Sequence, residues 1–159
     1  MTNKETFLEQ CIVLDTETTG KDYKTAEIIE SGFVIRENND WTIFQELHKP
    51  VNTPISPAVS ALTYITNKMV EDKPTFVDSK DVFQTVIDGF VDGYMVGHNY
   101  FYDMRVLQNH GIVMQDKSIC TWRMAKKLFN NVPEIEETNL PYLRFALELD
   151  VPIDMRCHR

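Results

Sequence analysis

Two carboxylates stand two positions apart at the end of an apolar run near the start of the chain. Asp15 and Glu17 follow the apolar residues 11–14, and Gly20 closes the segment. On a strand, side chains at positions i and i+2 point to the same face, so these two carboxylates would lie side by side. A cation between them relieves their repulsion, and hard oxygen ligands favour Mg²⁺ or Mn²⁺ over zinc. The pattern predicts a divalent metal site, with a solvated strand edge as the alternative.

The composition indicates a single globular domain. The chain has 159 residues, of which 43% are hydrophobic and 25% are charged. No apolar run approaches the length of a membrane span, and the polar start lacks the pattern of a secretory signal. The three cysteines are unclustered, which fits a reducing compartment. We therefore expect an intracellular, cytoplasmic protein that does not contact a membrane.

The net charge of −8 argues against a protein that coats duplex nucleic acid, because that mode of binding requires a basic surface. An enzyme that binds the end of a nucleic-acid strand remains compatible with this charge, since divalent ions supply positive charge locally. The one basic concentration without acids is residues 117–127. It indicates either a patch that contacts a nucleic-acid backbone or a solvated helix face.

Hydrophobic periodicity predicts three strands in the first third of the chain, at residues 11–15, 28–35 and 41–48. An Asn-Asn-Asp cluster between the last two is a hairpin signal, so the three strands should form an antiparallel meander. The prolines at 50, 54 and 57 predict a loop over residues 49–58.

Helices and short strands alternate after this loop. The pattern predicts strands at 94–98 and 118–120 and helices at 66–70, 79–90, 100–110, 121–129 and 139–149. A strand followed by a helix implies a parallel addition to the sheet. The predicted fold is therefore a mixed α/β sheet with helices on both faces, and it resembles the ribonuclease-H-like arrangement.

Three separated segments resemble, in order, the motifs of the DEDDh 3′→5′ exonucleases of the proofreading-subunit type. Residues 15–20 (Asp-Thr-Glu-Thr-Thr-Gly) resemble the first motif, and residues 97–103 resemble the second when aligned on Asp103. Residues 62–76 are similar to the linker between them. The third motif begins with a histidine, which His158 matches.

The family's third motif continues to a fourth carboxylate a few residues beyond its histidine. No residue of this sequence occupies that place, because the sequence given stops at Arg159. We therefore expect residues 1–159 to be a single exonuclease domain that is truncated at its C-terminal end, with a naturally shortened, impaired member as the alternative. This form should bind a divalent ion weakly and cut slowly or not at all.

The resemblance also assigns roles to individual residues. It implies that two ions, Mg²⁺ or Mn²⁺, are held by the carboxylates of Asp15, Glu17 and Asp103. His158 would be the general base, because an imidazole with a pKa near about 6.5 can accept a proton from water at neutral pH. Contacts to the terminal nucleotide are implied for four residues, Thr16, Thr18, Leu62 and Thr63.

The implied activity is hydrolysis of phosphodiester bonds at single-stranded 3′ ends of DNA or RNA, with release of nucleoside 5′-monophosphates by a two-metal mechanism. A polymerase or another replication or repair protein is a candidate partner. One alternative is a catalytically impaired module that binds nucleic-acid ends. Another is a Mg²⁺-dependent hydrolase of small nucleotides, which the lack of a Gly-rich phosphate loop and of an Asp-x-Asp nucleophile pattern makes weaker.

The remaining histidines and aromatics carry less specific signals. His98 ends a predicted strand, which suits either a supporting role beside the carboxylates or a packed ring. We expect His48 and His110 on the surface. Among the three aromatic residues at 100–102, helical spacing requires at least one to face the core, and we expect Phe101 to do so.

Overall fold

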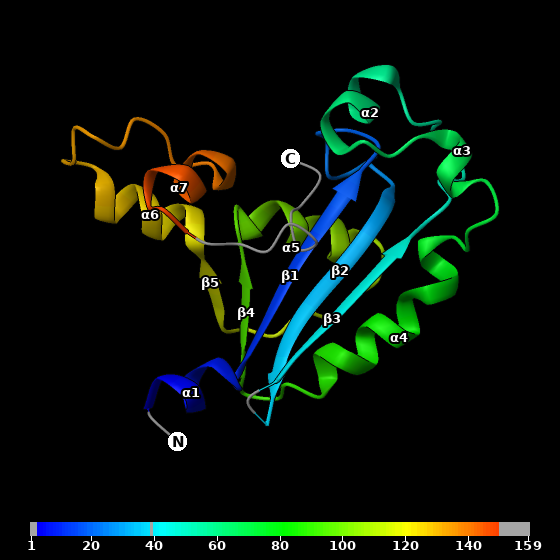
Figure 1. Ribbon diagram of the computed structural model, residues 1–159. Helices are drawn as coiled ribbons and strands as arrows, with labels where there is room; N and C mark the ends of the chain where they lie inside the picture. Colours follow the sequence, from blue (N-terminus) through cyan, green and yellow to red (C-terminus); the bar gives the residue numbers. More distant parts are fainter. Residues whose placement is uncertain (1–2, 39, 150–159) are drawn as a thin grey trace.

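A five-stranded mixed sheet forms the centre of the computed structural model, which describes residues 3–38 and 40–149 (Figure 1). The order across the sheet is β3-β2-β1-β4-β5. The strands are β1 (Cys11–Thr18), β2 (Ile28–Glu37), β3 (Asp40–Leu47), β4 (Tyr94–Gly97) and β5 (Ser118–Cys120). Strands β1, β2 and β3 pair antiparallel, whereas β4 pairs parallel with both β1 and β5. The predicted meander with parallel additions is confirmed.

The helices comprise five near the predicted positions and two that the sequence pattern did not predict. They are α1 (Asn3–Leu8), α2 (Pro57–Thr63), α3 (Asn67–Val70), α4 (Phe76–Asp88), α5 (Tyr100–Asn109), α6 (Thr121–Phe129) and α7 (Leu140–Ala146). The unpredicted helices are α1 and α2. Helix α4 begins three residues earlier than expected because Thr75 and Asp78 form a reciprocal capping box at its start. No helix among the described residues combines the length and the apolar character that a membrane crossing requires.

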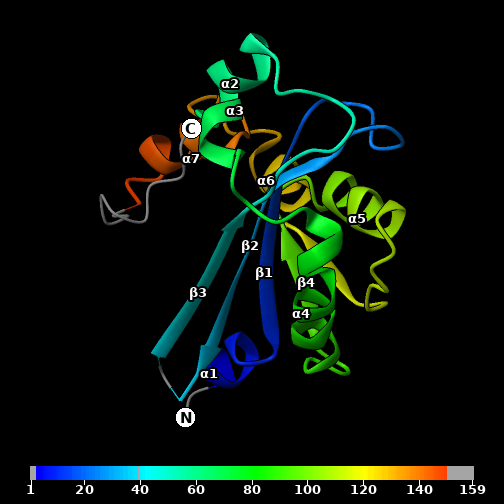
Figure 2. The ribbon, with the colours of Figure 1, turned by 90° about the vertical axis from the view of Figure 1, so that its right-hand side faces the viewer.

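Helices α4 and α5 lie together on one side of the sheet (Figure 2). The core between them and β1 contains Ile12 and Leu14 from the strand and Phe83 and Val106 from the helices, all at most 2% exposed. Side chains alternate along a strand, so the residue between the two β1 core positions, Val13, points to the opposite face and is 38% exposed. Because Ile12 and Leu14 face the core, the residues that alternate with them along β1 point away from α5.

Candidate active site

The carboxylates of Asp15 and Glu17 share one face of β1. Asp15 is exposed and Glu17 half-buried, whereas Thr16 and Thr18 between and after them are buried on the face toward α5. This alternation follows from the two-residue period of a strand, as the spacing predicts. The strand therefore presents two carboxylates on one side and two hydroxyls on the other.

Asp103 lies in the first turn of α5 and is only 4% exposed. Its Oδ1 accepts a hydrogen bond from the backbone N–H of Thr16 at 3.0 Å and another from the Thr16 hydroxyl at 2.7 Å. The helix can start this close to β1 because Gly97 has no side chain. A Cβ there would lie 3.2 Å from the carbonyl oxygen of Leu14 and 3.4 Å from the Cα of Tyr100.

The pKa of Asp103 is affected by the nearby carboxylate of Asp15. The pKa of Asp103 is raised to about 7, because burial and, to a lesser extent, the negative charge of Asp15 outweigh the hydrogen bonds from Thr16, which lower it. A buried carboxyl group beside a second carboxylate is a site where a bound cation favours the ionised form. A cation bound near these two carboxyl groups would therefore relieve their repulsion.

Tyr102 ties the end of β1 to α5 next to Asp103. Its hydroxyl donates to the carbonyl oxygen of Gly20 at 2.5 Å and lies 2.7 Å from the hydroxyl oxygen of Thr18. Together with the Asp103–Thr16 bonds, this contact joins two residues on the same face of β1, Thr16 and Thr18, to adjacent residues of α5. The motif resemblance gave no role to this tyrosine.

The expectation that Phe101 faces the core is wrong. Tyr100 is fully buried, and Phe101 is 39% exposed. The buried stripe of α5 consists of positions 100, 103, 106 and 107, so the carboxyl group of Asp103 occupies a core-facing position and Phe101 falls outside the stripe.

His98 stands beside the carboxylates, half-buried at the end of β4. Its Nδ1 lies 3.0 Å from the hydroxyl oxygen of Thr121, the first residue of α6. Burial lowers the pKa of His98, while a hydrogen bond with the backbone of Thr138 and the negative charge of Asp15 act in the opposite direction. The ring thus lies within electrostatic range of Asp15 and bonds to α6, and its supporting role stays a prediction beside the alternative of a packed ring.

A family comparison identifies the chain. The model of the family described as Exonuclease (RNase_T) matches residues 12–159. The chain belongs to this exonuclease family. The resemblance to the DEDDh-type 3′→5′ exonucleases is therefore confirmed.

Relatives of this exonuclease-family chain include bacterial DNA enzymes. Exodeoxyribonuclease 10 of Escherichia coli K12 is 29% identical over 148 residues, which is 92% of this chain and 60% of the relative. The DNA polymerase III subunit epsilon of Aquifex aeolicus is 29% identical over 126 residues, 74% of this chain and 59% of the relative. A PolC-type DNA polymerase III of Lacticaseibacillus paracasei is 33% identical over 113 residues, 68% of this chain and 8% of the relative. The chain thus spans at most 60% of the length of each relative.

Solved structures agree with the exonuclease assignment. Exonuclease X in complex with 5′ overhanging duplex DNA matches with a TM-score of 0.68 and 28% identity, covering 94% of this chain and 81% of that one. A product-bound exonuclease I matches with a TM-score of 0.75 at 13% identity, covering 92% of this chain and 40% of that one, and this likeness shows the shared fold. The predicted α/β, ribonuclease-H-like fold class is confirmed.

The residues that the exonuclease resemblance assigns to substrate contact differ in accessibility. Leu62 on α2 is 63% exposed, whereas Thr63 is 4% exposed and its hydroxyl donates to the carbonyl oxygen of Val59. The hydroxyls of Thr16 and Thr18 are already bonded to Asp103 and Tyr102 respectively. Of the four residues assigned by resemblance, Leu62 therefore has the most exposed side chain.

The exonuclease site is described only in part. His158 lies outside the described residues. Within residues 3–38 and 40–149, no three His, Cys, Asp or Glu side chains are grouped so that they could hold a metal ion. The structure brings Asp103 within electrostatic reach of Asp15 and places Glu17 on the same face of β1 as Asp15.

The exonuclease motifs left Glu27 without a role, although it fixes a loop beside the site. Its carboxylate accepts hydrogen bonds from the backbone N–H groups of Val51, Asn52 and Thr53 at 2.6, 2.9 and 2.7 Å. Its own backbone bonds to Thr19 in both directions, immediately after β1. The loop that leads into α2 is therefore attached to the end of the strand that carries Asp15. The partners are more than 20 positions apart, so no local signal marks this contact.

Two other histidines of the exonuclease domain correct the sequence expectation. His48 is fully buried rather than on the surface, with Nε2 2.7 Å from the hydroxyl oxygen of Ser31 and its ring edge-on to Phe76. Burial lowers its pKa to about 4. His110 is half-buried, and its Nδ1 lies 2.9 Å from the carbonyl oxygen of Val106.

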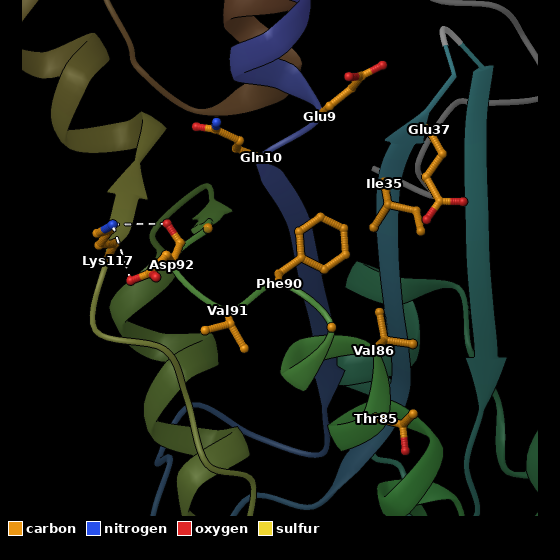
Figure 3. Close-up of a pocket in the computed structure, with 12 residues that line it drawn as sticks. Glu9, Gln10, Ile35, Glu37, Thr85, Val86, Phe90, Val91, Asp92 and Lys117 are labelled. Carbon is orange, nitrogen blue, oxygen red and sulfur yellow. Dashed lines mark hydrogen bonds and ion pairs between the residues drawn. The ribbon is translucent and has the colours of Figure 1, made fainter.

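A cavity of about 680 Å³ lies away from the exonuclease carboxylates (Figure 3). It is lined by Gln10 and Gly93, which precede β1 and β4, and by Phe90 and Lys117. Lys117 forms an exposed ion pair with Asp92 at its edge, at 3.7 Å. Because the catalytic candidates lie near the ends of β1 and β4, this cavity is not the candidate active site.

Proposed function

We propose that this chain is a 3′→5′ exonuclease domain that hydrolyses phosphodiester bonds at the 3′ ends of DNA or RNA and releases nucleoside 5′-monophosphates. The observation that carries the proposal is the placement of Asp103 against β1 by two hydrogen bonds from Thr16, beside Asp15. In a member of the exonuclease family, this contact joins the first and second motifs in space.

The carboxylates of Asp15, Glu17 and Asp103 would hold two divalent cations, Mg²⁺ or Mn²⁺. An all-oxygen donor set suits these ions, and the raised pKa of Asp103 beside Asp15 is the electrostatic condition that a cation relieves. When bound, the ions supply positive charge for the attacking and leaving oxygens of the displacement. Thr16 orients Asp103, and His158 is proposed to accept the proton of the attacking water.

The proposed substrate is the 3′ end of a single strand, and Leu62 and the backbone at Thr16 and Thr18 would contact its last nucleotide. DNA is the first substrate to test, because relatives are named exodeoxyribonuclease and DNA polymerase subunits. A replication polymerase is the proposed class of protein partner, and the name of the Aquifex aeolicus relative supports it.

A 5′-labelled single strand of DNA and its RNA counterpart, each incubated with Mn²⁺ or Mg²⁺, test this function. Shortening products and free 5′-monophosphates, formed at the low rate expected above for residues 1–159 and lost in EDTA or with Asp15→Asn, would establish the function. An unshortened strand that stays bound would instead indicate an end-binding module. Cleavage of a chromogenic phosphomonoester without strand shortening would indicate a hydrolase of small nucleotides.

A further inference from the structure

A hollow of about 430 Å³ lies along one side of α6 and is lined by none of the proposed carboxylate ligands. It is lined by five residues, which we call the α6 basic face: Trp122, Arg123, Lys126, Lys127 and Asn130. Their spacing of one and of three to four positions places them on one side of a helix. The three cationic side chains are exposed.

The charge of this face contrasts with that of the whole chain. Helix α6 contains three cations and no acid, in a chain whose net charge is −8. No carboxylate in the described part of the chain forms an ion pair with these cations. Aromatic rings contact two of them instead. The ammonium of Lys126 lies 3.7 Å from the ring centre of Trp122, and the guanidinium of Arg123 lies 4.9 Å from that of Phe101.

The α6 basic face adjoins the candidate active site at one end. Thr121, the first residue of α6, contacts His98, whose pKa responds to the charge of Asp15. Phe101, under Arg123, precedes Asp103 by two residues on α5. From Thr121 the helix carries Lys127 about 9 Å further along its axis, at about 1.5 Å per residue. The cations therefore extend outward from the site.

We propose that the α6 basic face binds the phosphate backbone of the single strand whose 3′ end occupies the carboxylate site. This inference rests on the proposed exonuclease function. A chain with this net charge repels a polyanion, so binding of a strand requires a local row of cations that are not neutralised by carboxylates. Exposed lysines and an arginine beside aromatic rings are the combination that single-strand binding grooves use.

Binding of a fluorescein-labelled single strand, measured by anisotropy in EDTA over a range of salt concentrations, tests the face without turnover. We expect Lys126→Gln combined with Lys127→Gln to weaken binding roughly tenfold near 0.15 M salt. The same change should make the slope of log K against log salt less negative by about 1.4, or about 0.7 for each lost phosphate contact. Lys126→Arg with Lys127→Arg keeps the charge and should bind like the wild type.

The single variant Lys126→Gln is also measured, and Lys117→Gln is its matched control, because it removes one positive charge at the opposite end of β4 and β5. It should leave binding unchanged.

A site-specific signal comes from Trp122, since Trp41 is the only other tryptophan and can be replaced by phenylalanine. In that background, fluorescence should change when the strand binds.

The outcomes separate the two proposals. Equal affinity and equal salt slope for the wild type and the double glutamine variant would overturn the α6 assignment, even if the wild type degrades the strand. An equal loss in Lys117→Gln would overturn it as well, as would the absence of any binding by the wild type. Binding that depends on the two lysines, without any strand shortening in Mn²⁺, would support the basic face and contradict the exonuclease function.

Discussion

The backbone N–H and the hydroxyl of Thr16 both donate hydrogen bonds to Oδ1 of Asp103, which lies 87 positions away in the sequence. The donor lies between Asp15 and Glu17 on the strand, and its side chain points to the opposite face. A single residue thus links the strand that carries two proposed ligands to the helix that carries the third. The relative placement of the ligands depends on this contact.

Thr16→Val should weaken both the fold and the reaction. Valine has nearly the same shape, so the main change is the loss of the hydroxyl hydrogen bond to a buried carboxylate. We expect the free energy of unfolding in urea to fall by about 1–2 kcal/mol. Turnover of a single strand should fall by roughly 10–100-fold, as for the loss of a partner that orients a metal ligand.

Thr42→Val is the control for this change, because Thr42 is exposed on the edge strand β3. Its free energy of unfolding should stay within about 0.5 kcal/mol of the wild type. If Thr16→Val matched Thr42→Val in both stability and turnover, the Asp103 contact would have no role in positioning.

Asp15→Asn should remove the response of the protein to divalent ions. Binding of a ligand to the native state alone raises the free energy of unfolding by about 2.7 kcal/mol at a hundredfold excess over Kd. We therefore expect Mn²⁺ to raise the Tm of the wild type and to leave the Tm of the variant unchanged, with turnover reduced by more than about a hundredfold. Asp116→Asn, at an exposed position, should behave like the wild type. A normal rise in Tm for Asp15→Asn would contradict the ligand assignment.

The features that the sequence predicted well depend on short-range periodicity. The two-residue period of β1 places Asp15 and Glu17 on one face, and it can be read from adjacent residues. The meander and the parallel strands follow from similar local patterns. Helix α2 was missed because its proline was taken as a loop signal. Pro57 instead occupies the first turn, where a missing N–H costs nothing, after the capping residue Ser56.

The features that the sequence did not predict depend on contacts between distant segments. The burial of His48 arises from Ser31 on β2 and Phe76 at the start of α4, and neither is a sequence neighbour. Helical spacing required at least one of the three aromatic residues at 100–102 to face the core, and Phe101 was the one expected to do so. The helix turns Asp103 inward instead, because Thr16 satisfies that carboxylate. A buried polar residue with a distant partner leaves no trace in hydrophobic periodicity.

The contribution of His48 to the stability of the fold should fall as the pH is lowered, because its ring is buried in the neutral form. Burial lowers its pKa to about 4, against the effect of the Glu46 charge, while an unfolded histidine titrates near 6.5. The unfolded state therefore binds the proton more tightly. This contribution is complete above about pH 6.5 and is lost as the pH falls toward 4, amounting to roughly 3 kcal/mol.

Urea unfolding of the wild type and of His48→Gln between pH 7.5 and 4 measures the effect. Glutamine can still bond to the hydroxyl of Ser31 and does not titrate in this range. The wild type should lose more free energy of unfolding than the variant over the interval. Parallel pH profiles of the two proteins would show that His48 does not carry this dependence.

Glu27→Gln should loosen the loop that leads into α2. The carboxylate accepts three backbone N–H groups, and an amide offers them one neutral oxygen. Hydrogen bonds to a charged acceptor are worth more than those to a neutral one, by about 1 kcal/mol for a partly exposed group. We expect amide hydrogen exchange at Val51, Asn52 and Thr53 to accelerate roughly fivefold.

Glu71→Gln, which neutralises an exposed acid just after α3, should leave the exchange of these three amides unchanged. In turnover assays, Glu27→Gln should raise KM more than it lowers kcat, because Leu62 on the attached helix is proposed to contact the last nucleotide rather than the reacting phosphate. A fall in kcat at unchanged KM would contradict this explanation. It would indicate that Glu27 affects the carboxylates of β1 instead, through the hydrogen bonds between its backbone and Thr19.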